Sequence, residues 1–118
     1  MDNQRLIKPD KGDKVKLNAY YQQYNELRKI QANAHYQLAD ACYHIKDFVT
    51  CESSLTLAVK QWEKLVLHNP EYQNELSPLL LRSYETLKLC YEAMGKLQMA
   101  QYMDTRKTKL LATMNSNS

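Results

Sequence analysis

Apolar residues recur along most of the chain at spacings of three and four, which is the period of an α-helix that buries one side. In the first third of the sequence this pattern sharpens into a seven-residue repeat with one polar member, Gln31. We call this set the heptad seam, and its members are Leu17, Tyr20, Tyr24, Leu27, Gln31, Ala34, Leu38, Ala41 and Ile45. A strand would alternate with a period of two, so the seam predicts one long helix over residues 13–46.

Three more helices are predicted by the same criterion. The apolar positions of a second helix, over residues 48–68, are Phe48, Cys51, Leu55, Ala58, Trp62 and Leu65. Those of a third helix are Leu80, Tyr84, Leu87, Tyr91 and Met94. Those of a fourth helix are Leu97, Ala100, Met103, Leu110 and Met114. We expect the third helix to begin near Pro78, because proline fits the first turn of a helix.

The residues that interrupt helices divide the chain simply. The 118 residues include only 2 Gly and 3 Pro. Pro9 and Gly12 close a polar segment, and the sequence ends in "NSNS". We therefore expect a flexible polar arm over residues 1–12, one helical domain over residues 13–114, and a disordered tail over residues 115–118. The predicted fold class is all-α, with four antiparallel helices in two hairpins.

Two segments of the chain share an order of small, aromatic and aliphatic residues. The first segment contains Ala34, Leu38, Ala39, Cys42, Cys51, Leu55 and Ala58. The second segment contains Tyr84, Leu87, Tyr91, Gly95, Leu97 and Ala100. Over residues 33–104 the chain thereby resembles the tetratricopeptide (TPR) repeat family in a long-helix variant. The resemblance implies two helix-turn-helix hairpins that stack as a fragment of a right-handed solenoid.

The resemblance also locates the turn of the first hairpin. Aligning "KDFVTC" with "GKLQMA" pairs Lys46 with Gly95, so the chain should reverse around Lys46 and Asp47 without a glycine. The two turns are further apart than the usual TPR period of about 34 residues. The positions that depart from the family pattern are His35, Lys46, Lys88, Asp104 and Lys107.

In TPR proteins the first helix of each hairpin lines a concave groove, and the resemblance carries this role to both hairpins. The groove residues of the first hairpin would be Asn33, Tyr36, Asp40, Tyr43 and His44. Those of the second would be Arg82, Glu85, Leu89 and Glu92. Tyrosine and arginine are common binding hot spots, so we expect an adaptor or chaperone that holds a peptide or helix of another protein. Alternatively, Tyr36 and Tyr43 simply cover the neighbouring helix.

Composition argues against most other functions. The formal charge is +3, with both signs interleaved, which is not the single-sign stripe expected of a nucleic-acid-binding protein. No apolar run reaches the roughly 18 residues of a membrane span. The odd count of 3 Cys, together with a charged N-terminal segment, favours a reducing, cytoplasmic environment. We therefore expect a protein partner and neither nucleic acid nor membrane.

The candidate chemistry is equally sparse. His35 and Cys42 share a helical face, but no His or Cys pair has the close spacing typical of zinc ligands. There is no glycine-rich phosphate loop, and the carboxylates are scattered over helical positions. The sequence predicts no metal, no cofactor, no small-molecule substrate and no enzymatic activity.

A second hypothesis is structural. The heptad seam could pair with the same helix of another copy, with Gln31 as its polar position. The chain would then form a homodimer or a larger assembly through its first helix.

Overall fold

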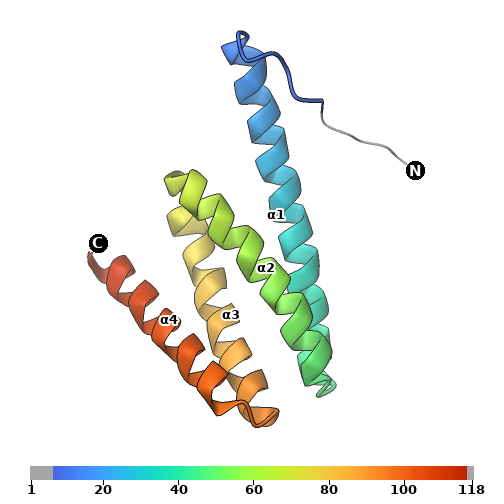
Figure 1. The fold of residues 1–118 in the computed structure, drawn as a ribbon, viewed down its shortest axis with the longest axis vertical. Helices are drawn as coiled ribbons and strands as arrows, with labels where there is room; N and C mark the ends of the chain where they lie inside the picture. Colours follow the sequence, from blue (N-terminus) through green and yellow to red (C-terminus); the bar gives the residue numbers. More distant parts are fainter. Residues whose placement is uncertain (1–6, 117–118) are drawn as a thin grey trace.

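The computed structural model describes residues 7–116 and contains four α-helices. These are α1 (Lys14–His44), α2 (Phe48–His68), α3 (Gln73–Ala93) and α4 (Leu97–Ser116). A short 3₁₀ helix, η1 (Pro70–Tyr72), joins α2 to α3, and the described part of the chain has no strand. Helix α2 packs against both α1 and α3, and α3 packs against α4 (Figure 1). The prediction of an all-α fold with four helices is confirmed.

The ends of the first two helices follow from local sequence. Asp13 precedes α1, and its side chain accepts a hydrogen bond from the backbone N–H of Lys16 at 3.1 Å. Asp47 caps α2 in the same way through the N–H of Thr50 at 3.2 Å. Each carboxylate satisfies a donor that the first turn of a helix leaves free. The predicted bounds of α2 agree with the structure, and those of α1 differ by two residues or fewer.

The predicted start of the third helix is wrong. Helix α3 begins at Gln73, so Pro78 lies inside it rather than in its first turn. Pro70 occupies the favourable place instead, because it opens η1, which continues directly into α3. Only Pro70 occupies the first-turn position that the rule favours.

The expected terminal segments overlap the described residues only in part. Residues 1–6 of the arm and residues 117–118 of the tail lie outside the described residues. Residues 7–12 precede α1 and contain no helix. Helix α4 runs through Asn115 and Ser116, beyond the predicted end of the domain at residue 114.

The two hairpin turns have the same backbone structure. Lys46 and Gly95 both adopt positive φ, 65° and 75° respectively. The N–H of Asp47 donates to the carbonyl of Cys42 at 2.8 Å, and the N–H of Lys46 donates to that of Tyr43 at 3.0 Å. The second turn repeats this pair of bonds, from Lys96 to Tyr91 at 2.7 Å and from Gly95 to Glu92 at 3.1 Å. This is the Schellman ending of a helix, and it places a turn between the two helices at Lys46 and Asp47, where the sequence predicts one.

The core is centred on α2 and α3. Trp62 and Leu55 of α2 and Leu76 and Leu87 of α3 are each less than 2% exposed. Helix α1 contributes Ala32, Ala39 and Cys42 to this core. The short side chains of the two alanines let α2 approach the α1 backbone closely. The fully buried residues of α1 are therefore small, and the half-buried Tyr36 and Tyr43 pack against the same core.

The heptad seam is not the buried face of α1, which corrects the expectation that it forms core. Leu38 is 51% exposed and Ile45 is 74% exposed, whereas Ala39, adjacent to Leu38, is 1% exposed. Successive helical residues point about 100° apart, so these neighbours face different directions. Periodicity identified an apolar stripe correctly but could not identify which stripe α2 covers.

Substitutions at Trp62 and at Leu38 should therefore have very different effects on the stability of the protein. We expect Trp62→Ala to lower the free energy of unfolding by about 3–5 kcal/mol, because it empties a buried site. We expect Leu38→Ala to change it by less than about 1 kcal/mol, because Leu38 is half exposed. Urea unfolding followed by circular dichroism measures both. A large loss for Leu38→Ala would contradict the orientation of α1.

The shared turn gives a matched pair of substitutions. Lys46→Gly should raise the free energy of unfolding by up to about 1 kcal/mol, because glycine adopts positive φ without strain. Gly95→Ala should lower it by about 1 kcal/mol for the same reason. A Cβ at residue 95 would meet no atom within 4 Å, so backbone strain alone would act there. Thermal unfolding of both variants checks this, and changes of equal sign would contradict it.

Candidate interaction surface

One side of α1 has no helix packed on it. Helix α1 has 31 residues and α2 has 21, so the N-terminal part of α1 extends past the end of α2 (Figure 1). The heptad seam lies on the side of α1 that α2 leaves uncovered. Its exposed members are Tyr24, Leu27, Gln31, Ala34, Leu38, Ala41 and Ile45. A stripe of apolar side chains thus follows α1 in contact with solvent.

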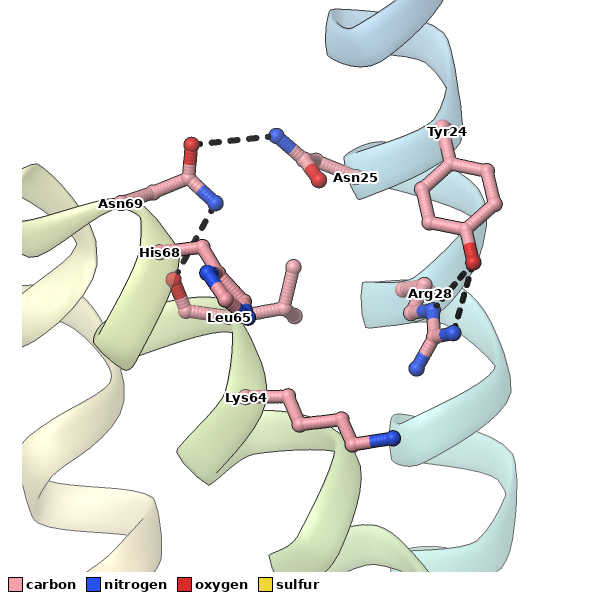
Figure 2. A pocket seen from close by; sticks show the side chains of 7 residues that line it. All are labelled: Tyr24, Asn25, Arg28, Lys64, Leu65, His68 and Asn69. Carbon is pink, nitrogen blue, oxygen red and sulfur yellow. Dashed lines mark hydrogen bonds between the residues drawn. The ribbon is translucent and has the colours of Figure 1, made fainter.

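Beside the seam, α1 and α2 enclose two adjoining hollows that we call the α1–α2 cleft. The first, of about 250 Å³, is lined by Tyr24, Asn25, Arg28, Lys64, Leu65, His68 and Asn69 (Figure 2). The second, of about 350 Å³, is lined by Arg28, Lys60, Gln61, Glu63, Lys64 and Leu67. Arg28 and Lys64 line both hollows, so the two hollows lie next to each other.

Hydrogen bonds fix the walls of the cleft. Asn25 of α1 donates its side-chain N–H to Oδ1 of Asn69 at 3.4 Å, and Asn69 donates to the carbonyl of Leu65 at 3.2 Å (Figure 2). Gln61 of α2 donates to Oε1 of Gln31 at 3.2 Å. Gln31 is a member of the seam, so this last bond joins the seam to the cleft.

Arg28 is held against Tyr24 at the edge of the seam. Its Nε and Nη2 donate to the Tyr24 hydroxyl at 3.2 Å and 2.6 Å, and the guanidinium lies 5.0 Å from the ring centroid. Figure 2 shows the side chain of Lys64 reaching from α2 toward this pair. The cleft therefore brings cations from two helices together beside aromatic and aliphatic groups.

The charges of the cleft are unbalanced. Within residues 7–116, Arg28, Lys60 and Lys64 form no ion pair. The one carboxylate among the lining residues, Glu63, accepts hydrogen bonds from Arg106 and from the Tyr84 hydroxyl. The neighbouring Lys29 pairs with Glu26 at 3.2 Å and with Glu75 at 2.9 Å, and its bond to Glu75 is the main cause of its raised pKa. The cleft consequently has a positive charge that no residue in the described range neutralises through an ion pair.

A third hollow, of about 210 Å³, lies among α2, α3 and α4. Within it Glu63 joins Tyr84 and Arg106 across these three helices, and Lys60, which also lines the second hollow, lines this one from α2. Glu52 likewise accepts a hydrogen bond from the Tyr91 hydroxyl at 2.7 Å. Burial raises the pKa of Tyr84 to about 12, and burial followed by the Glu52 interaction raises that of Tyr91 to about 12. We regard this network as structural.

The groove residues that the TPR resemblance implies have several different environments. Tyr36 packs on Trp62 with ring centroids 5.4 Å apart, and Tyr43 packs on Phe48 at 5.9 Å, so both contact α2. This is the arrangement of the alternative in which the two tyrosines cover the neighbouring helix. Glu85 pairs with Lys107 at 3.0 Å. The exposed members are Asn33, Asp40, His44, Arg82, Leu89 and Glu92.

These residues do not line the α1–α2 cleft. Asp40 and His44 lie 3.6 Å apart, next to each other on α1. The ion pair between Lys29 and Glu75 links α1 to the beginning of α3. The implied groove residues come later in both helices, from Asn33 on α1 and from Arg82 on α3. The structure thus leaves them on two helices whose shared neighbour is α2.

The cleft cations were missed by sequence reasoning, although a signal was present. Lys60 and Lys64 stand four residues apart on α2, and His68 follows one turn later. Like charges at this spacing repel and destabilise an isolated helix, so such a row needs an explanation outside the helix. Arg28 had no comparable signal, because only the packing of α1 on α2 brings it to the row.

Comparison of the chain with protein-family models, with curated proteins and with solved structures gives no match. Within residues 7–116, no helix is both long enough and apolar enough to cross a membrane. No group of three or more His, Cys, Asp or Glu side chains in that range could hold a metal ion. The surface itself is therefore the basis for assigning a function.

The buried tyrosines predict a loss of stability in alkali. The pKa of Tyr84 and Tyr91 is about 12 in the folded protein and about 10 in an unfolded chain. The stabilisation that comes from keeping these two tyrosines protonated is complete below about pH 10. It is lost as the pH rises to about 12, because the unfolded state releases these protons at a lower pH than the folded state does.

We expect the urea midpoint of unfolding to be lower at about pH 11 than at about pH 8. Tyr91→Phe should be less stable at the lower pH and should show a smaller further decrease, because it lacks one of the titrating groups. Equal decreases in wild type and variant would contradict the role of Tyr91.

Proposed function

We propose that the chain is a protein–protein interaction module of adaptor or chaperone type, and that it holds an α-helix of a partner protein. The observation that supports this most directly is the heptad seam, which remains open along α1 while α2 packs on another face. A seven-residue apolar repeat is the pattern that packs against a second helix by knobs-into-holes contacts. The partner helix would lie along the seam and over the α1–α2 cleft.

This site differs from the groove that the TPR resemblance implies. Tyr36 and Tyr43 were expected to contact a partner there, but both already pack against α2. The seam exposes apolar side chains, and Arg28, Lys60 and Lys64 beside it have no described ion pair. We therefore place the partner on the side of α1 that carries Leu27 and Leu38.

We also infer that the four helices form two antiparallel TPR-like hairpins of a right-handed solenoid. The identical turns at Lys46 and Gly95 support this, because they begin the second helix of each pair in the same way. Burial of Ala39, Cys51 and Ala100, which occupy small-residue positions of the repeat, supports it as well.

The proposed role is non-enzymatic and cytoplasmic. The three cysteines are free and buried, in keeping with a reducing compartment. Burial, followed by the contact with Cys90 at 3.4 Å, raises the pKa of Cys51 to about 12. Such a thiol stays protonated at neutral pH and is a poor nucleophile, which supports a packing role.

A second candidate is self-association through the same seam. The seam is compatible with a copy of itself, since its apolar members are interrupted by Gln31 alone, and one polar seam position can set the register of a helix pair. Two copies joined along α1 would hide the apolar stripe from solvent on both.

The proposed site is tested with displayed amphipathic helices of about four heptads, whose apolar positions are randomised. We expect selected helices to bind the wild-type protein and to lose about ten-fold or more in affinity for Leu38→Glu, because a buried carboxylate would face the seam. The matched control is Leu97→Glu on α4, which is 68% exposed in the wild type and should bind normally.

Failure to select any helix, or equal binding by both variants, would contradict the proposed site. Analytical sedimentation at micromolar concentration measures the oligomeric state and so distinguishes self-association from the binding of a partner helix. A wild-type dimer that Leu38→Glu dissociates would favour self-association over a partner helix.

A further inference from the structure

We propose that the α1–α2 cleft selects a partner helix whose apolar stripe is flanked by aspartate or glutamate. This inference rests on the proposed function, in which the seam and the cleft hold a helix of another protein. It adds the chemistry of the partner: a carboxylate-bearing flank that lies against Arg28, Lys60 and Lys64.

The cations occupy the flank of the docking surface rather than its centre. Lys60 and Lys64 are exposed and project from successive turns of α2, beside the second hollow. Arg28 lies across from them on α1 and lines both hollows. A helix seated on the seam would therefore present one flank to cations from both helices.

Three of the four carboxylates of α1 and α2 pair with a cation or a tyrosine, and the exposed Asp40 lies beside a histidine. Glu26 pairs with Lys29, Asp40 lies beside His44, Glu52 binds Tyr91, and Glu63 binds Arg106. Of these, only Glu63 lines the cleft. The positive charge of the cleft is thus available to a ligand rather than neutralised from within.

Arg28 is already oriented for a carboxylate. Its Nε and Nη2 both donate to the Tyr24 hydroxyl, which holds the guanidinium in place while Nη1 makes no described bond. A planar guanidinium offers several N–H donors that match a carboxylate, and a fixed one loses less conformational entropy on binding. Lys64 reaches toward the same place from α2 (Figure 2).

Charge complementarity favours this partner over a second copy of the chain. Two copies paired along their seams would bring like-charged clefts into one interface, and Glu63, the one carboxylate that lines each cleft, is already bound to Arg106. Like charges placed together weaken an interface and disfavour the wrong partner.

The apolar area beside the cations favours a helix over a polyanion. Leu57 and Leu67 of α2 are 49% and 73% exposed, and Leu27 and Leu38 line the open side of α1. A phosphate backbone would leave these side chains uncovered, whereas the apolar stripe of a helix would bury them.

The experiment uses the same displayed helices with a fixed leucine seam, while each flanking position varies among glutamate, glutamine and lysine. We expect selection on the wild-type protein to enrich glutamate on one flank. A synthetic glutamate-flanked helix should then bind about ten-fold or more tightly than its lysine-flanked counterpart, and added salt should reduce the difference.

A charge-reversal variant tests which residues are responsible. The double variant Lys60→Glu with Lys64→Glu should reverse the preference toward lysine-flanked helices. The matched control, Lys96→Glu with Lys109→Glu, makes the same change in net charge at exposed positions outside the cleft and should keep the preference for glutamate. Circular dichroism confirms that both variants remain helical.

The outcomes separate this inference from the proposed function. Seam-dependent binding without enrichment of either charge would overturn the acidic partner and leave the proposed function standing. No helix binding at all would overturn both. Tighter binding to single-stranded RNA or to vesicles of anionic lipid than to the glutamate-flanked helix would overturn the acidic helix as the occupant of the cleft.

Discussion

The packing of α2 between α1 and α3 is the interaction on which the rest of the structure depends. Trp62 is 1% exposed and lies against Tyr36 of α1, with ring centroids 5.4 Å apart. On α1, the buried residues Ala32 and Ala39 have short side chains, which leave room for the large Trp62 side chain of α2. Because α2 takes this face, the heptad seam stays open, and the proposed docking surface is a direct consequence of how Trp62 is buried.

The same packing decides where charge is neutralised. On the α3 and α4 side of α2, Glu63 joins Tyr84 and Arg106 in one network, which keeps a partly buried carboxylate paired. Lys64 lies beside α1, and Lys60 lines the hollows on both sides of α2; neither has a described ionic partner. Helix α2 therefore carries one carboxylate neutralised by α3 and α4 and two lysines without described ionic partners.

Lys46 shows how a tertiary contact can support an unfavourable local conformation. A residue with a Cβ at positive φ is disfavoured by about 1–2 kcal/mol, and Gly95 avoids this cost in the equivalent turn. The first turn persists because its helix ending is fully hydrogen-bonded and the helices it joins bury Ala39, Cys42 and Cys51 against the core. The two turns thus reach the same backbone geometry from different sequences.

The sequence by itself determined the four helices, the bounds of α2 and the turn at Lys46, because periodicity, capping and turn chemistry act between residues close in the chain. It did not determine whether Pro70 or Pro78 begins a helix, since both fit the local rule. Nor could it decide whether α2 covers Leu38 or Ala39 of α1, or that Arg28 would lie beside Lys64. Those outcomes depend on which faces pack together, and helix packing selects a face by the fit of side chains distant in sequence.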